Sequence, residues 1–261
     1  MKSMQLNTRR FGGGEPVLIL HGLLGSGRNW QAISKALASD VEVFAIDLRN
    51  HGGSPWSDEM TYPAMAGDIL RLLDDFGIGQ ATLVGHSMGG KVAMCAALAY
   101  PDRIRRLGVV DIAPVAYDHG HGFQAYLETM LSLDLASMSR RGDVEAGLAA
   151  TIPEAPIRAF LAQNSSPGEA GLVWRSNLRV LLDGLPAITG WPEPVAGAVY
   201  EGPTLFLRGG ASGYVRDSAM GEIRHLFPDS DLETIDGVGH WVHAEAPRAT
   251  IEALRRLLAR D

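Results

Sequence analysis

One serine in the chain stands in a context that favours nucleophilic catalysis. Residues 85–90 read Gly-His-Ser-Met-Gly-Gly, so Ser87 has a glycine two positions before it and another two positions after it. A serine on a sharp strand-to-helix turn needs small residues at both positions, because a Cβ there would collide with the turn. The pattern therefore indicates a nucleophile elbow, which exposes the serine hydroxyl for attack on a carbonyl carbon.

The segments on either side of Ser87 have the composition that such a turn requires. Residues 81–84 form an apolar run typical of a buried strand, and residues 91–100 have the small and apolar residues of a packed helix. A chain with 31 glycines could produce the five-residue pattern by chance. A strand and a helix in the required order argue against chance and support Ser87 as the nucleophile.

His240 is the leading candidate for the base that activates this serine. A serine hydroxyl is a weak nucleophile near neutral pH, so it needs a base, and the base needs an acceptor that orients it. His240 lies in a glycine-containing loop, residues 236–241, between the last predicted strand and the last predicted helix. His243 is the alternative, but it lies nearer the helix start, where a capping or packing role is expected.

The acid of the triad is open among three aspartates. The commonest position follows the predicted strand at residues 204–207, and there the chain has Ser212, which cannot supply a negative charge. Asp111 ends the predicted strand at residues 107–110 and could reach the same imidazole from the other side, so we favour it. Asp217 and Asp236 are the alternatives.

Backbone amides are expected to stabilise the oxyanion. The amide of Met88 follows the nucleophile at the start of a helix, and the amide of Leu23 lies in the glycine-containing loop at residues 21–26. His21 and His86 flank tight turns and are interpreted as structural. The chain has no histidine or carboxylate spacing typical of a metal site, and the proposed chemistry needs no cofactor.

Strand and helix patterns alternate along most of the chain, which predicts an α/β fold with a mostly parallel sheet covered on both faces. We expect Asp47, Arg49 and His51, after the second strand, to form a hydrogen-bonded scaffold under the site. The expected strands are residues 17–20, 41–46, 81–84, 107–110, 204–207 and 232–235. The expected helices of this part are residues 30–38, 62–76, 91–100, 218–227 and 247–258.

Residues 116–194 have a different pattern, without a clear strand. Amphipathic helical segments are predicted near 123–133, 144–150, 157–163 and 177–182. We interpret the region as a helical cap inserted into a core formed by residues 1–115 and 195–261. Its apolar residues could line an acyl pocket, although such spacing is more often plain core. They are Phe123, Leu127, Met130, Phe160, Trp174 and Leu178.

The composition of the chain excludes several other classes of function. With 261 residues, a net charge of −7 and no basic cluster, the chain is not expected to bind nucleic acid. Cys95 is the only cysteine, so an intrachain disulfide or a cysteine metal cluster is impossible. No run of 18 apolar residues and no apolar N-terminal segment occur, which predicts no membrane span and a cytoplasmic location. The sequence makes no prediction of an oligomeric state.

Taken together, these segments resemble the α/β-hydrolase superfamily along nearly the whole chain, and within it the YbfF type of bacterial esterase. The last three of the matching segments are long and specific. The segments are residues 21–23 (HGL), 49–52 (RNHG), 62–66 (YPAMA), 85–91 (GHSMGGK), 111–115 (DIAPV) and 239–245 (GHWVHAE).

The resemblance implies an esterase or acyl-CoA thioesterase acting on a small acyl ester or thioester. It also implies the acid at Asp111, and it implies that Trp174, Arg175 and Asn177 belong to a cap segment that lines the acyl pocket. Two other activities keep the same triad, namely carbon–carbon bond hydrolysis and cofactor-free perhydrolysis. A ligand receptor on this fold is the alternative that is not an enzyme.

Overall fold

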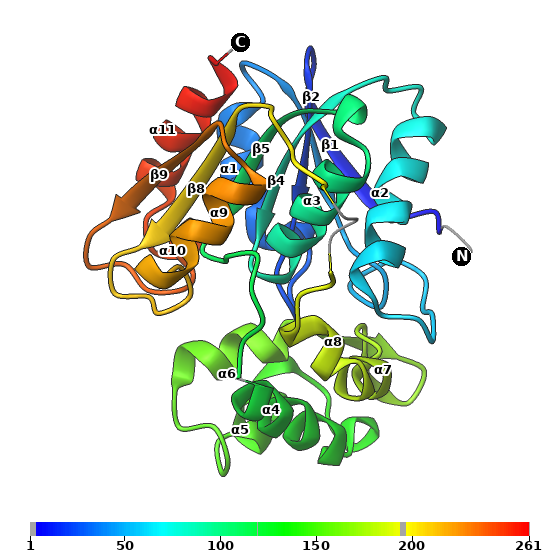
Figure 1. The fold of residues 1–261 in the computed structure, drawn as a ribbon. Helices are drawn as coiled ribbons and strands as arrows, with labels where there is room; N and C mark the ends of the chain where they lie inside the picture. Colours follow the sequence, from blue (N-terminus) through cyan, green and yellow to red (C-terminus); the bar gives the residue numbers. More distant parts are fainter. Residues whose placement is uncertain (1–3, 119, 194–196, 261) are drawn as a thin grey trace.

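The computed structural model describes residues 4–118, 120–193 and 197–260 (Figure 1). They include a seven-stranded sheet in the order β1-β3-β2-β4-β5-β8-β9. Neighbouring strands run parallel except for β1, which is antiparallel to β3, so the predicted α/β fold is confirmed. The strands are β1 (Thr8–Gly12), β2 (Pro16–Leu20), β3 (Glu42–Ile46), β4 (Ala81–His86), β5 (Ile104–Val110), β8 (Thr204–Gly209) and β9 (Ser230–Ile235).

Apolar side chains on the two faces of the sheet belong to two separate cores. In β2, Leu18 and Leu20 pack with α2 and α3, whereas Val17 and Ile19 pack with α1 and α11. A strand covered on both faces must be apolar at every position, which explains its continuous apolar run. The helices around the sheet are α1 (Gln31–Leu37), α2 (Tyr62–Asp75), α3 (Met88–Ala99), α9 (Met220–Leu226), α10 (Val242–Glu245) and α11 (Pro247–Leu258).

Strand β1 is absent from the sequence prediction. It reads Thr-Arg-Arg-Phe-Gly and lies at the edge of the sheet, where most of its side chains stay partly exposed. The Arg10 guanidinium lies 5.1 Å from the ring centre of Phe44 and 5.4 Å from that of Phe76. Because an edge strand needs few apolar residues and tolerates charge, its hydrophobic pattern is weak.

The inserted region contains one hairpin that the sequence analysis did not predict. Strands β6 (Ser165–Gly168) and β7 (Gly171–Trp174) pair antiparallel, so the expectation of no strand between residues 116 and 194 is wrong. Each strand has only four residues, and together they include a proline and two glycines, which hides the strand pattern. The helices of this region are α4 (Gly120–Ser132), α5 (Arg141–Leu148), α6 (Ala155–Ala162), α7 (Leu178–Asp183) and α8 (Leu185–Thr189).

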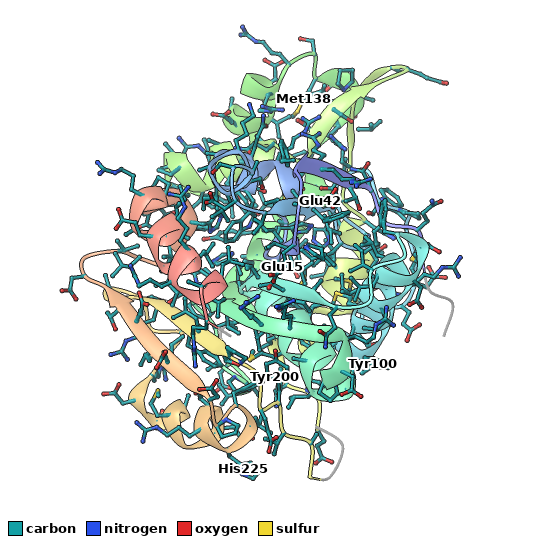
Figure 2. The ribbon with its side chains drawn as sticks, turned by 90° about the horizontal axis from the view of Figure 1, so that it is seen from above. Glu15, Glu42, Tyr100, Met138, Tyr200 and His225 are labelled. Carbon is teal, nitrogen blue, oxygen red and sulfur yellow. The ribbon has the colours of Figure 1, made fainter. Side chains whose placement is uncertain are left out.

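Helices α4 to α8 lie together beyond one end of the sheet, and we call this part the cap (Figure 1). Met138 of the cap and His225 at the end of α9 lie at opposite ends of the molecule in Figure 2. The predicted core boundary at residue 195 lies outside the described residues, and the division into two domains remains a prediction. None of the helices in the described residues is long and apolar enough to cross a membrane.

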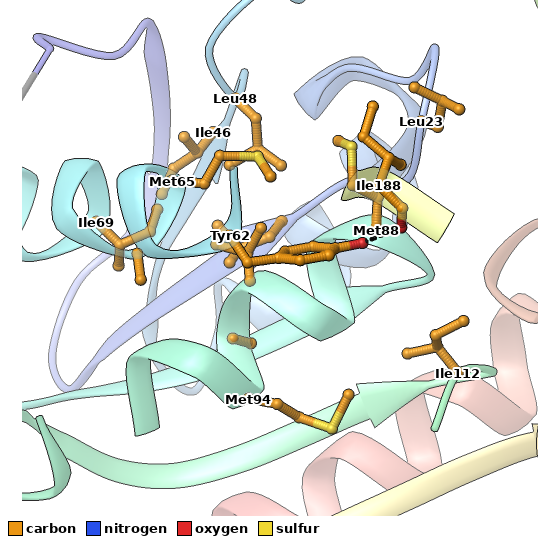
Figure 3. Packing of buried hydrophobic residues seen from close by; sticks show 14 of the residues in the cluster. Leu23, Ile46, Leu48, Tyr62, Met65, Ile69, Met88, Met94, Ile112 and Ile188 are labelled. Carbon is orange, nitrogen blue, oxygen red and sulfur yellow. Dashed lines mark hydrogen bonds between the residues drawn. The ribbon is translucent and has the colours of Figure 1, made fainter. Parts of the chain in front are cut away.

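The cap meets the core through both apolar and polar contacts. Figure 3 shows Ile188 of α8 beside Leu23 and Met88 of the core, with the hydroxyl of Tyr62 directed at α8. This hydroxyl donates a hydrogen bond to the carbonyl oxygen of Ile188. Helix α2 therefore contributes to both the core and the joint with the cap.

Candidate active site

Ser87 occupies the turn between β4 and α3, as the elbow pattern predicts. Its backbone has φ 52° and ψ −118°, which a residue with a side chain rarely adopts. A Cβ at Gly85 would lie 2.2 Å from the carbonyl oxygen of Gly89, and a Cβ at Gly89 would lie 2.5 Å from that of Leu20. Steric contact therefore requires both glycines, and the prediction of a strained elbow is confirmed.

His240 and Asp111 come together at the same edge of the sheet. His240 Nδ1 lies 2.7 Å from Asp111 Oδ2, and the other carboxylate oxygen of Asp111 accepts a hydrogen bond of 3.0 Å from the amide of Gly209. Asp111 directly follows β5, is fully buried and has φ 52°. With its Nδ1 proton donated to this carboxylate, His240 keeps Nε2 as the nitrogen that can accept a proton.

The alternative candidates for acid and base lie in other environments. Asp217 pairs with Arg208 at 3.0 Å and its side chain is 91% exposed, and Asp236 is also exposed. His243 is buried against Trp30, with ring centres 4.5 Å apart and planes 8° apart. Burial lowers the pKa of His243 to about 3, so this imidazole stays neutral.

The loop after β8 supports the histidine–aspartate pair. The hydroxyl of Ser212 donates a hydrogen bond to Asp111 Oδ2, the oxygen that also meets His240. The ring of Tyr214 stacks on the His240 ring, with centres 3.9 Å apart and planes 20° apart. The sequence analysis noticed Ser212 only as a missing acid and did not single out Tyr214. Their roles depend on contacts between β5 and β8, which no local pattern shows.

Three neighbouring cavities lie around the site. The inner cavity has a volume of about 30 Å³, the middle cavity also has about 30 Å³, and the outer groove has about 300 Å³. Ser87 lines the inner and middle cavities, and His240 lines the middle one. The inner cavity is lined by Leu23, Tyr62, Ser87, Met88, Lys91, Ile112, Tyr117, Phe123, Ile188, Thr189 and Tyr214. The middle cavity is lined by His21, Gly22, Leu23, Gly25, Asn29, His86, Ser87, Phe123, Phe160, His240, Trp241 and His243. The outer groove is lined by Asn29, Pro156, Ala159, Phe160, Gln163, Trp241, His243, Ala244 and Glu245.

The two residues predicted to supply oxyanion donors both lie beside Ser87. Met88 is the first residue of α3, where a backbone amide has no acceptor within its own helix. Leu23 lies in the turn closed by the hydrogen bond from the Gly25 amide to the carbonyl oxygen of Gly22. Both side chains are buried, and both residues line the inner cavity.

Two buried histidines hold the loop that carries Leu23. The amide of Leu48 donates to His21 Nε2 at 2.9 Å, and the amide of Leu24 donates to His51 Nε2 at 3.2 Å. The two contacts are reciprocal. His21, after β2, accepts from the loop after β3, and His51, after β3, accepts from the loop after β2. Burial lowers the pKa of both histidines, that of His51 to about 3, so both remain neutral acceptors.

The rest of the predicted scaffold also consists of buried hydrogen bonds. Asp47 accepts from the amides of Gly27 and Gly53, both at 2.8 Å. Arg49 forms a two-pronged ion pair with Asp68, at 2.7 and 2.9 Å. These contacts tie the loop after β3 to the neighbouring loop and to α2.

His86 packs beneath the catalytic loop. Its Nε2 lies 2.9 Å from the backbone carbonyl oxygen of His240. Its ring centre lies 4.7 Å from that of His240 and 4.6 Å from that of His243. Burial lowers the pKa of His86 well below its ordinary value, so a neutral ring supports the loop.

Lys91 is a buried cation that the sequence analysis did not assign. It lies one helical turn after Ser87, and its Nζ donates a hydrogen bond of 3.0 Å to the carbonyl oxygen of Thr189 and another to that of Gly190. The ammonium group also lies 4.7 Å from the ring centre of Tyr117. Burial lowers the pKa of Lys91 to about 7.

The three cap residues predicted to bind substrate line none of these three cavities. Trp174 pairs with Ser165 in the hairpin, and Arg175 donates to the carbonyl oxygen of Gly52 at 3.3 Å. The amide of Asn177 donates to the carbonyl oxygen of Asn50 at 2.9 Å. We propose that Arg175 and Asn177 join the cap to the core. Of the predicted pocket residues, Phe123 and Phe160 do line the cavities, whereas Leu127, Met130 and Leu178 are buried in the cap.

Metal-ligating groups do not gather at this site. Over residues 4–118, 120–193 and 197–260, no group of three or more His, Cys, Asp or Glu side chains is arranged to hold a metal ion. The polar groups around Ser87 instead bond one another and the backbone.

Comparison with known proteins identifies the family of the chain. Residues 15–247 match the family of the alpha/beta hydrolase fold, and the chain belongs to this family. It is 37% identical to esterase YbfF of Escherichia coli over 243 residues, which cover 93% of this chain and 92% of YbfF. It is 39% identical to the sn-1-specific diacylglycerol lipase ABHD11 of Danio rerio over 249 residues, 93% of this chain and 78% of that protein.

A solved structure extends the likeness to the whole fold. The structure of an esterase from a marine microorganism aligns with a TM-score of 0.94 and 35% identity, covering 98% of this chain and 100% of that one. With esterases and a lipase as its relatives, the protein is an enzyme with hydrolase activity that acts on esters.

Proposed function

We propose that the protein is a serine hydrolase that cleaves carboxylic esters through Ser87, His240 and Asp111. The observation that carries this proposal is the 2.7 Å contact between His240 and Asp111, with Ser87 and His240 lining one cavity. The contact leaves Nε2 of His240 available to take the Ser87 proton. Acyl thioesters could follow the same route.

The reaction has two steps. Ser87 Oγ attacks the ester carbonyl carbon while His240 takes its proton, and the amides of Leu23 and Met88 stabilise the oxyanion. His240 then protonates the leaving alcohol, which gives an acyl-enzyme at Ser87. Water attacks the acyl-enzyme with His240 as base and releases the acid, and Asp111 stabilises the imidazolium in both steps.

The experiment is Ser87→Ala, assayed with p-nitrophenyl butyrate and with a fluorophosphonate probe. Turnover should fall by about 10⁴-fold or more and labelling should disappear. Ser132→Ala is the matched control, because Ser132 is exposed on the cap. A Ser87→Ala protein that keeps the wild-type rate would remove Ser87 as nucleophile. A wild-type protein that neither turns over esters nor reacts with the probe would refute the enzyme mechanism.

A further inference from the structure

The three cavities adjoin one another in series, and Ser87 lies where the inner and middle cavities meet. Leu23, Ser87 and Phe123 line both the inner and the middle cavity. Asn29, Phe160, Trp241 and His243 are common to the middle cavity and the outer groove. A substrate that reacts at Ser87 can therefore extend in two directions, inward under α8 or outward between α6 and α10.

The position of His240 distinguishes these two directions. After attack by Ser87, the bond between the acyl carbon and the alcohol oxygen breaks, and that oxygen receives its proton from His240. The leaving oxygen must therefore lie on the side of Ser87 where His240 is accessible. His240 lines the middle cavity and is absent from the described residues that line the inner one. This geometry directs the alcohol outward and leaves the inner cavity to the acyl group.

The inner cavity is narrow. Its volume of about 30 Å³ admits roughly two water-sized groups. Four residues of its lining are joined in pairs by hydrogen bonds that link core and cap, from Tyr62 to the carbonyl oxygen of Ile188 and from Lys91 to that of Thr189. A long acyl chain needs more room than this cavity has, whereas a chain of about four carbons or fewer needs only small side-chain movements.

The outer groove has a volume of about 300 Å³, ten times that of the inner cavity. Its lining also differs in chemistry. Phe160 of α6 and Trp241 before α10 lie across it, with ring centres 6.2 Å apart. Asn29 Nδ2 lies 3.3 Å from Gln163 Oε1, so exposed amides border the aromatic pair. Among the described residues that line the groove, Glu245 carries the charge, because burial keeps His243 neutral. Apolar segments and hydroxyl groups fit this lining, and anionic groups do not.

We propose that the outer groove is the leaving-group site, so that the enzyme prefers short acyl groups esterified to longer, uncharged alcohols. This inference rests on the proposed function, because it uses His240 as the proton donor. The alcohol lies along Phe160 and Trp241, and the acyl group points towards Lys91.

Two ester series test the direction. In the first, the acyl group is acetyl and the alcohol is methanol, butanol or octanol; in the second, the alcohol is methanol and the acid is acetic, butyric or octanoic. We expect kcat/KM to rise at least tenfold from methyl to octyl acetate and to fall at least tenfold from methyl acetate to methyl octanoate. A kcat/KM that falls as the alcohol lengthens and rises as the acyl group lengthens would overturn the proposal.

A pair of variants tests the location. Ala159 lines the outer groove, and Ala159→Trp should reduce the ratio of kcat/KM for octyl acetate over methyl acetate at least tenfold. Ala146→Trp is the control, because Ala146 is exposed on α5 and lines none of the three cavities. An unchanged alcohol ratio in Ala159→Trp, or a change in the acyl-length ratio instead, would refute the assignment.

A third variant tests the charge preference. Gln163→Arg adds a cation to the groove, so it should raise kcat/KM for the acetate ester of 8-hydroxyoctanoate relative to octyl acetate about tenfold. No change in this ratio would contradict a leaving group lying along Gln163. In each of these experiments Ser87→Ala is assayed in parallel. If Ser87→Ala is inactive while the kcat/KM ratios do not change as expected, the assignment of the leaving-group site is wrong and the proposed function stands.

Discussion

Around Ser87 the chain is held by backbone hydrogen bonds, whereas the cap is joined to the core largely by side chains. The amide of Ser87 donates to the carbonyl oxygen of Val110 at 3.0 Å, and that of Asp111 donates to Leu207 at 2.8 Å. The sheet register thus continues one residue beyond each strand into the site. On the cap side, the contacts are those of Lys91 with Thr189, Tyr62 with Ile188, Asn164 with Leu24 and Arg175 with Gly52.

This difference indicates that the two regions have different roles. A side-chain hydrogen bond contributes only about 0.5–1.5 kcal/mol and can re-form after a small movement. A residue bonded within the sheet cannot shift without disturbing its neighbouring strands. We therefore propose that the core fixes the geometry of the reacting groups and that the cap controls how substrate reaches them. Four substitutions test this comparison, from the largest expected effect to the smallest.

The largest effect is expected for Asp111→Asn in the backbone-held region. Asparagine tolerates the positive φ of this position, so the fold should survive. Its amide cannot orient and stabilise the imidazolium, so kcat should fall by roughly 10⁴-fold. Asp217→Asn is the control and should have an effect below about twofold, because Asp217 lies at an exposed ion pair. Steady-state kinetics of both variants measure these effects. A loss of activity confined to Asp217→Asn would show that Asp111 is not the acid of the triad.

Gly85→Ala should be the most destabilising change in the same region. The new Cβ would meet the Gly89 carbonyl oxygen at 2.2 Å, which we expect to cost at least about 3 kcal/mol in the free energy of unfolding. Gly67→Ala in α2 is the matched control, since nothing lies within 4 Å of its Cβ and helix propensity should add about 1 kcal/mol. Urea unfolding measures both. Equal stability of the two variants would show that the elbow relaxes more easily than the contacts imply.

Asn164→Ala tests the joint of the cap. Asn164 Nδ2 donates to the carbonyl oxygen of Leu24 at 2.9 Å, and Asn164 Oδ1 accepts from Ser176 Oγ at 2.7 Å. Leaving these buried partners unpaired should cost about 1–3 kcal/mol and make the cap more susceptible to limited proteolysis. Thr129→Ala, on α4, is the control for a change within the cap. A cap as resistant as that of the wild type would show that Asn164 does not hold the joint.

Lys91→Met should give the smallest effect over a single pH unit, visible as a change in the slope of stability with pH. The pKa of Lys91 falls from an ordinary 10.5 to about 7 on folding. Between these values the unfolded chain binds more protons, so this group makes the wild type more stable as pH rises, by at most about 1.4 kcal/mol per pH unit. Lys91→Met should lack this increase, whereas the exposed Lys35→Met should retain it. Parallel slopes for Lys91→Met and the wild type between pH 7 and 10 would contradict a buried, titrating Lys91.

Local patterns were sufficient for the parts of the protein that local sterics control. Gly85, Ser87 and Gly89 predict the elbow because the collision they avoid lies within five residues of the chain. The apolar runs of β2 and β4 predict buried strands, since both faces of each are covered. Strand β1 and the hairpin of β6 and β7 were not predicted, because charged residues, proline and glycine interrupt the apolar pattern there.

Tertiary structure decided which distant residues meet. The sequence left Asp111, Asp217 and Asp236 open as the partner of His240, and the pairing of β5 with β8 brings Asp111 and Ser212 together beside that histidine. It also placed Arg175 and Asn177 at the cap joint rather than in the cavities around Ser87. The conformation of a turn depends on residues close to it in the sequence. A triad and a substrate path depend on the order of the strands and on how the cap packs against the core.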